Sequence, residues 1–170
     1  MKPFFKRFIT AIRDENERPR WEEDLVDKIN EMYTHISPEG GILTVLTNKT
    51  GAASIKGTLV QASAANDKSF VAADTNGFTS IGAVYDDGIA DGKPCRVVIC
   101  GVADVLLQDG TASAAGDWVR VSASAAGRAT AHTGVPSPPT TDTHFKEIGH
   151  CIQTVSSGTN VLTKIIMHFN

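Results

Sequence analysis

The chain has 170 residues, which is enough for one domain with an appendage and for a core that needs no disulfide or metal staples. Its 16 basic and 19 acidic residues give a formal net charge of −3 at pH 7, so the chain lacks the basic excess of nucleic-acid-binding proteins. Aromatic residues make up 6% of the sequence, whereas Ala, Gly, Ser, Thr and Val are abundant, which favours tightly turned β structure. The apolar run Phe8–Ile12 is too short for a signal peptide, and no stretch reaches membrane-spanning length. We therefore expect a soluble protein made in the cytoplasm.

Residues 3 to about 36 predict two helices. Pro3 and Pro19 each fit the first position of a helix, where the missing N–H does no harm. One helix is expected to run to about Glu17 and the other from Pro19 to about His35.

The first helix begins with three phenylalanines on one apolar face and three cations beside them. Exposed apolar side chains imply a partner, and the cations indicate that the partner surface is acidic. Docking of this face on the rest of the chain, or binding to a membrane surface, are the alternatives. The candidate contact residues are Lys2, Phe4, Phe5, Lys6, Arg7 and Phe8.

The second helix carries apolar residues with a four-three-four spacing, which is the seam of a coiled coil. The seam lasts about two heptads, so packing onto the parent domain is an equal alternative. The candidate oligomerisation residues are Leu25, Ile29, Met32 and Ile36.

From Ile42 onward the pattern changes to alternating or short apolar runs separated by Gly-bearing turns, which is typical of a β-sandwich or β-barrel. The expected strands are 42–47, 57–62, 70–73, 79–85, 95–100, 102–107, 118–122, 147–153 and 161–168. The Pro-rich segment 135–143 cannot continue a central strand and is expected to be a long surface loop.

The β-rich part contains an internal repeat. Seven residues from Gly51 to Ala64 recur at one constant offset in the segment that starts at Gly110. Further on, Ile81-Gly82 returns as Ile148-Gly149 at a slightly larger offset, and the Pro-rich loop can absorb the difference. The repeat predicts two quasi-equivalent units of roughly 60 residues, about 42–100 and 101–168. Turns and apolar strand positions are repeated, which indicates a scaffold or a binding surface.

No residues form a recognisable catalytic or ligand-binding constellation. His150 and Cys151 are neighbours on a predicted strand and point to opposite faces, so they cannot pair as base and nucleophile. The histidines share no zinc-ligand spacing, and the acidic turn from Asp86 to Gly92 lacks the terminal Glu of an EF-hand. Three cysteines without regular spacing argue against a disulfide framework. We therefore predict no catalytic residues, no cofactor and no metal site.

From Gly51 to the C-terminus the sequence resembles the capsid decoration, or cement, proteins of tailed bacteriophages. The resemblance rests on Ile81-Gly82 before an acidic Gly-rich turn, on the run from Cys95 to Val105, and on Ala114-Ala-Gly-Asp117-Trp-Val-Arg-Val121. It implies a small, tulip-like β-barrel that is trimeric on the shell and has a terminal arm that clamps neighbouring capsid subunits.

We therefore predict a mainly β protein: a helical arm over residues 1–36 and an antiparallel β-barrel or sandwich over 37–170. The expected function is structural: a homotrimer binds the major capsid protein on the outer surface of a phage shell and stabilises it, without enzymatic activity, nucleic acid or membrane.

Four other functions remain open from the sequence. The chain could be the base of a spike or fibre, or a host-facing adhesin that holds a glycan with the 135–143 loop and the Gly-Asp turns. It could be a cysteine hydrolase, or a cellular protein anchored to membranes by its first helix.

Overall fold

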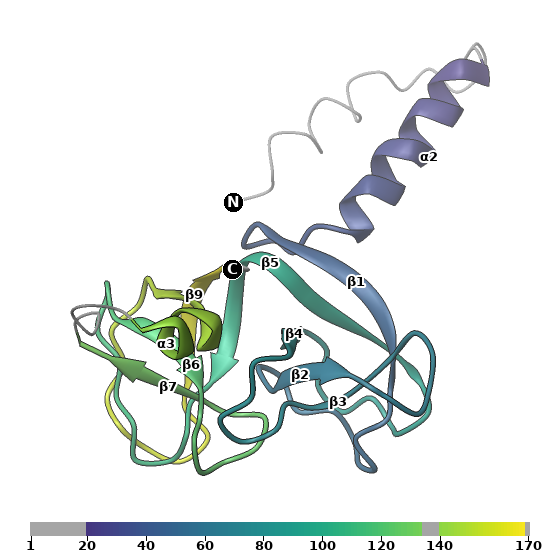
Figure 1. Ribbon diagram of the computed structural model, residues 1–170. Helices are drawn as coiled ribbons and strands as arrows, with labels where there is room; N and C mark the ends of the chain where they lie inside the picture. Colours follow the sequence, from purple (N-terminus) through teal and green to yellow (C-terminus); the bar gives the residue numbers. More distant parts are fainter. Residues whose placement is uncertain (1–19, 134–139, 169–170) are drawn as a thin grey trace. The chain divides into compact units, whose positions relative to one another are not determined.

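The computed structural model describes residues 20–133 and 140–168 of the chain. The chain divides into two compact units, Met1–Thr34 and His35–Asn170. In the first unit the described element is helix α2 (Arg20–Thr34), which agrees with the helix expected to start at Pro19. The second unit contains the strands and is called the β body below (Figure 1).

The β body has nine strands and one short helix within the described residues. The strands are β1 (Gly41–Asn48), β2 (Leu59–Ala62), β3 (Ser69–Ala72), β4 (Ser80–Val84), β5 (Pro94–Leu106), β6 (Trp118–Val121), β7 (Ala129–His132), β8 (Glu147–Cys151) and β9 (Leu162–Met167), and the helix is α3 (Thr141–Lys146). The predicted mainly β class, a barrel or sandwich, is confirmed.

The first half of the β body is a closed five-stranded barrel. The strand order is β1-β3-β2-β4-β5, and β1 also pairs with β5, so the sheet returns to its first strand. The β1–β3 pair is parallel, and the other neighbours are antiparallel. Closure leaves no free sheet edge among these strands.

The second half repeats this arrangement, and β5 belongs to both halves. The order continues as β5-β9-β8-β6-β7, and a parallel bridge between Leu107 and Ala129 joins the end of β5 to β7. This bridge corresponds to the parallel pair Asn48–Phe70 of the first half. In Figure 1 the long strand β5 passes between the blue strands of the first half and the green-to-yellow strands of the second.

The residues that recur in the sequence make equivalent hydrogen bonds in the two halves. The Gly57 N–H donates to the Val84 carbonyl, and the Gly116 N–H donates to the Cys151 carbonyl, both at 2.8 Å. Both glycines have positive φ, at +81° and +93°. The repeat therefore preserves turns that glycine adopts without steric cost.

The repeated Ile-Gly pair marks a close approach of two strands. A Cβ on Gly82 would lie 2.4 Å from the Val98 carbonyl oxygen, and a Cβ on Gly149 would lie 2.1 Å from that of Ile166. No side chain fits at either place, so the sequence needs glycine where β4 meets β5 and where β8 meets β9.

The hydrophobic core joins the two halves. Its larger cluster contains Leu59 and Ala83 from the first half together with Val119, Cys151 and Ile165 from the second. A smaller cluster inside the first barrel includes Val60, Phe70 and Val97. Because one continuous cluster spans both halves, the β body has a common core.

The structure differs from the predicted strands in two places. The strands expected at 95–100 and 102–107 form the single strand β5, because Gly101, with φ of +85°, lets the chain continue across the expected break. Strand β7 was not predicted, since Ala129-Thr-Ala-His132 has little apolar character, although Ala129 is fully buried.

The Pro-rich segment, predicted as a loop over 135–143, gives way to α3 from Thr141. Its residues 135–139 lie outside the described part of the chain. Within the described residues, no helix has the length and apolar character to cross a membrane.

Candidate functional site

An exposed apolar surface lies where β1, β5 and β9 adjoin. Ile36 forms a β-bridge with Ile42, and Ile42 pairs with Cys100 of β5. Two residues further along β5, Val102 pairs with Ile166 of β9. Ile36, Ile42 and Ile166 are 47, 49 and 48% exposed. We call Ile36, Ile42, Val102 and Ile166 the apolar strip.

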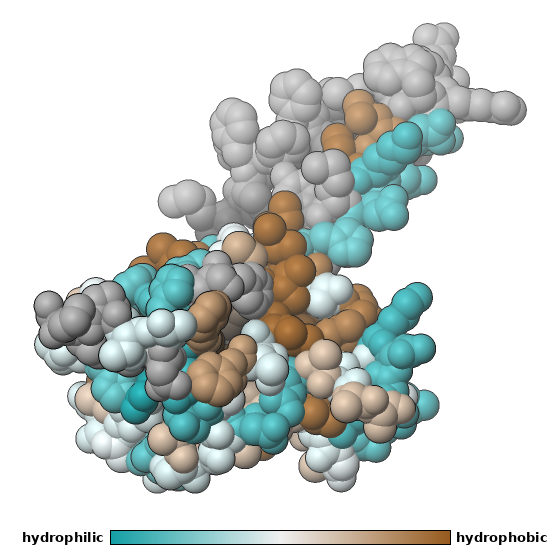
Figure 2. Space-filling model, in the orientation of Figure 1, coloured by the Kyte–Doolittle hydropathy of each residue, from teal (hydrophilic) through white to brown (hydrophobic). Residues whose placement is uncertain are grey.

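Apolar residues also gather on the face of the β body seen in Figure 2, in brown, over the region where β1 and β5 run in Figure 1. Single exposed apolar residues are normal, but neighbouring ones on one sheet surface indicate a contact with another macromolecule.

Charged side chains lie at the β5–β9 end of the apolar strip. Asp104 of β5 pairs with Lys164 of β9. This pair lies two residues along each strand from the pair Val102–Ile166, and therefore on the same face of the sheet. Its carboxylate accepts from Lys164 Nζ at 2.8 Å and lies 2.7 Å from Lys56 Nζ. Burial opposes ionisation of Asp104, but these two lysines outweigh it and hold the pKa of its carboxyl below the ordinary value.

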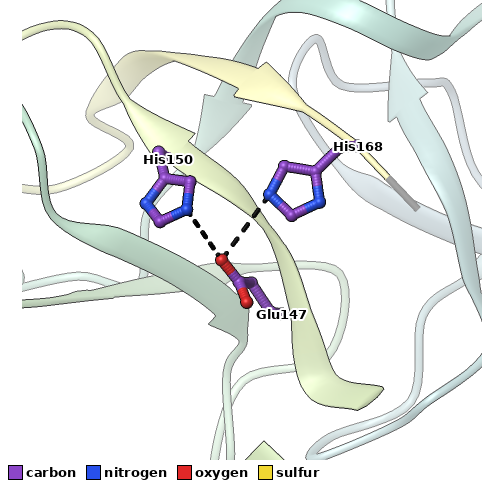
Figure 3. A group of neighbouring side chains, drawn as sticks. All are labelled: Glu147, His150 and His168. Carbon is purple, nitrogen blue, oxygen red and sulfur yellow. Dashed lines mark ion pairs between the residues drawn. The ribbon is translucent and has the colours of Figure 1, made fainter. Parts of the chain in front are cut away.

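A group of three polar side chains lies on the other side of Ile166. Glu147 and His150 come from β8, His150 pairs with Ile166, and His168 follows the end of β9. Figure 3 shows both imidazoles pointing at the Glu147 carboxylate. His150 Nε2 lies 2.9 Å and His168 Nε2 3.5 Å from the same oxygen, Oε1. We call these three residues the His–Glu cluster.

A β-bulge brings Glu147 and His150 to one face. Residues three apart on a regular strand point to opposite faces. On β8, however, Gly149 pairs with Val119 and Glu147 pairs with Arg120, so two steps on β8 oppose one step on β6. The extra residue, Ile148, reverses the alternation and turns Glu147 toward His150.

The His–Glu cluster borders a small hollow. The hollow has a volume of about 120 Å³, and its lining includes Glu147, His168, Lys146 and the aromatic rings of Phe78 and Phe145. Phe78 and Phe145 are 58 and 53% exposed, and Lys146 Nζ lies 4.9 Å from the centre of the Phe78 ring. The cluster therefore adjoins a polar concavity with aromatic rims.

Sequence reasoning missed the His–Glu cluster, because its members are spread over 22 positions of the chain and share no ligand spacing. The repeat holds the signal that could have found it. By strand pairing, Glu147 and His150 correspond to Ser80 and Ala83 of the first half. Strand pairing also makes Ile166 of β9 equivalent to Val98 of β5, so His168, two residues further on, is equivalent to Cys100.

The predicted contact residues Lys2, Phe4, Phe5, Lys6, Arg7 and Phe8 lie outside the described part of the chain. In the predicted seam, Leu25 of α2 is 50% exposed and Ile29 is half-buried. Met32 also lies on α2, but Ile36 lies beyond the end of the helix and belongs to the apolar strip. Shell contact by the first set and oligomerisation through the second set therefore remain predictions.

The cysteines are all free thiols. Cys151 is buried whereas His150 is exposed, so the two side chains do point to opposite faces. Burial is the main cause of a raised pKa at both the Cys95 and the Cys151 thiol, which disfavours the reactive thiolate at these positions.

The acidic turn uses its carboxylates to hold the chain in place. Asp87 accepts from the Lys56 N–H at 3.0 Å and Asp91 from the Gly51 N–H at 2.9 Å. Asp86 pairs with Arg96, whose hydrogen bond is the main cause of the lowered pKa of that carboxyl, against the effect of burial. These contacts explain the acidic residues as parts of a turn.

Comparison with known proteins identifies a fold neighbour. The chain is similar to the crystal structure of the head fiber gp8.5 N base of bacteriophage phi29. The likeness has a TM-score of 0.50 at 13% sequence identity and covers 75% of this chain and 93% of that one. At this identity it shows a shared fold. No known protein family and no curated protein matches the sequence.

Proposed function

We propose that this protein is a structural component of a bacteriophage virion that attaches to the outer surface of the capsid and stabilises it. The observation that carries the proposal is the fold, which resembles the base of a phage head fibre along three quarters of the chain. The resemblance of the sequence to capsid decoration proteins points to the same location. The proposal includes no catalytic activity.

The attachment is expected to depend on several weak contacts made at once. A symmetric trimer that contacts several capsid subunits gains effective concentration for each further contact, so a small interface per copy is sufficient. The basic aromatic residues Lys2 to Phe8 would contact the shell. The apolar strip would contact a second copy of the chain, because Ile36 is both a member of the strip and one of the predicted oligomerisation residues.

The first test is the oligomeric state. Light scattering of the full chain should give the mass of a trimer. Ile42→Asp or Ile166→Asp should lower this mass toward that of a monomer, because each places a charge in the contact between copies. Ile55→Asp, at a residue that is 57% exposed outside the strip, is the matched control. A trimer that persists in both strip variants would remove the strip from the proposal.

The second test is binding to shells. Deletion of residues 1–13 should leave a folded β body that no longer sediments with capsids of the phage that encodes the chain. Circular dichroism of the deletion variant controls for folding. Retained co-sedimentation would remove the N-terminal arm from the account, and failure of the full chain to co-sediment would contradict the capsid function.

A second candidate function is the base of a head fibre, favoured by the fold neighbour, which is the base of a phage head fibre. The two functions differ in what they do to the shell. A decoration protein should raise the melting temperature of capsids that contain no other surface protein. A fibre base should bind to the same capsids without raising that temperature, and should retain a further virion protein.

A further inference from the structure

We infer that the His–Glu cluster, Glu147, His150 and His168, is a binding site for a zinc-like divalent metal ion. This site is independent of the capsid function proposed above. It rests on the donor set, on the distances between the donor atoms, and on a comparison between the two halves of the β body.

The donor set suits zinc better than it suits the hard cations Ca²⁺ and Mg²⁺. Two imidazole nitrogens and one carboxylate oxygen form the three-ligand set of many zinc sites in proteins, with a fourth position open to water or another ligand. Ca²⁺ and Mg²⁺ take oxygen ligands, so two imidazoles would serve them poorly. Zn²⁺, Co²⁺ and Ni²⁺ accept imidazole readily.

The distances are close to those of a coordinated ion. With metal–ligand bonds near 2.05 Å, two donor atoms of a tetrahedral site lie roughly 3.3 Å apart. Here the two nitrogen-to-oxygen distances are 2.9 and 3.5 Å, and all three donor atoms lie within 4.8 Å of one another. Small rotations of these side chains would place an ion between them.

The site is open to ions from solution. The side chains of His150 and His168 are 46 and 37% exposed, whereas that of Glu147 is 17% exposed. The carboxylate is therefore the more sheltered member, and the imidazoles lie on its solvent side. Two cations belong to the neighbouring elements: Arg120 of β6, which pairs with Glu147 of β8, and Lys146 at the end of α3.

The first half of the β body shows that the fold does not need these residues. It has the same bulge on β4, where Val60 pairs with Gly82 and Gln61 with Ser80. At the positions of Glu147 and His150 it carries Ser80 and Ala83, which supply neither a carboxylate nor an imidazole. The backbone therefore forms without the cluster, and metal binding supplies a reason for it in the second half.

The expected consequence is a staple between two strands. Glu147 and His150 belong to β8, and His168 follows β9, so a bound ion would link the two strands. An ion that binds the folded state and not the unfolded state raises thermal stability. Zinc should therefore raise the melting temperature of the β body.

The test uses the full chain without an affinity tag, since a polyhistidine tag would bind the same metals. Calorimetric titration with Zn²⁺ alone should give one ion per chain. Each of Glu147→Gln, His150→Gln and His168→Gln should weaken binding by more than about 100-fold, because loss of a group that only hydrogen-bonds to a metal ligand already costs about 10- to 100-fold. Circular dichroism checks that each variant is folded.

Two variants serve as matched controls. His35→Gln removes an exposed histidine of the same unit, and Cys100→Ser removes the half-buried thiol of β5. Both should bind zinc like the parent chain. Co²⁺ should show ligand-field absorption without a thiolate charge-transfer band, and a zinc anomalous peak should lie between the three side chains.

Three results would overturn the inference: no stoichiometric binding by the parent chain, undiminished affinity in Glu147→Gln, His150→Gln and His168→Gln, or loss of binding in Cys100→Ser. The first would leave the His–Glu cluster as a surface ion pair, and the others would move the metal to another site. None of them bears on binding to capsids.

Discussion

Asp104 is the residue on which two lysines from different parts of the β body converge. Lys164 lies opposite on β9, and Lys56 comes from the loop before β2. The Asp104 side chain is 16% exposed and those of the lysines are each 36% exposed. The carboxylate is thus sheltered while the two cations reach water. We therefore expect this group of three charges to be more stabilising than an ordinary surface ion pair.

Asp104→Asn should lower the free energy of unfolding by about 1–2 kcal/mol at pH 7, since hydrogen bonds to a charged group are lost. The folded pKa of Asp104 lies below its unfolded value, so its contribution is present above about pH 4 and is lost as the pH falls further. Urea unfolding at pH 7 and at pH 3 should therefore show a difference between parent and variant that shrinks at pH 3. Asp67→Asn, at an exposed residue of the β2–β3 turn, is the control. An equal difference at both pH values would contradict the assignment.

At the scale of elements, the two Ile-Gly pairs show how sequence and strand packing constrain each other. The bulge after Val60 and the bulge after Val119 each insert a residue just before the glycine. Each glycine then lies against a carbonyl of the next strand, where a Cβ has no room. The bulge on β8 turns Glu147 onto the face of His150. The same bulge therefore occurs in both halves, but it positions the residues of the His–Glu cluster in the second half.

Gly149→Ala and Gly82→Ala should each destabilise the protein by about 3 kcal/mol or more, because an added Cβ would press on backbone atoms. Gly88→Ala is the matched control, since its φ is +75° but nothing lies within 4 Å of the added atom. It should cost only the conformational strain, about 1 kcal/mol. Thermal and urea unfolding measure all three. Similar losses in the three variants would mean that close packing is not what selects glycine at the Ile-Gly pairs.

At the scale of the whole molecule, β5 and the common core make the two halves of the β body interdependent. β5 pairs with β1 and β4 of the first half and with β9 of the second. The larger core cluster takes residues from both. Neither half has a complete barrel without β5, so we expect residues 35–168 to unfold as one cooperative unit.

Ile165→Ala tests this interdependence, since Ile165 is fully buried on β9. The free energy of unfolding should fall by about 2–5 kcal/mol, as for other large-to-small core changes. Amide hydrogen exchange should accelerate in β2 and β3 as much as in β6 and β8. Ile152→Ala, at a residue that is 45% exposed, should change little and is the control. Acceleration confined to β6–β9 would show that the halves open separately.

The sequence by itself determined the β class, the helix after Pro19, most strands and the internal repeat, because alternation, proline and glycine act through local sterics. The offset between Ile81-Gly82 and Ile148-Gly149 also indicated where the second unit is longer. Tertiary structure alone decided that β5 is continuous and shared, since the sequence shows Gly101 as a break and not the partners on both sides. It also decided that Glu147, His150 and His168 meet. That meeting depends on a bulge and on the register of β8 with β9, and register is a property of paired strands that no single segment contains.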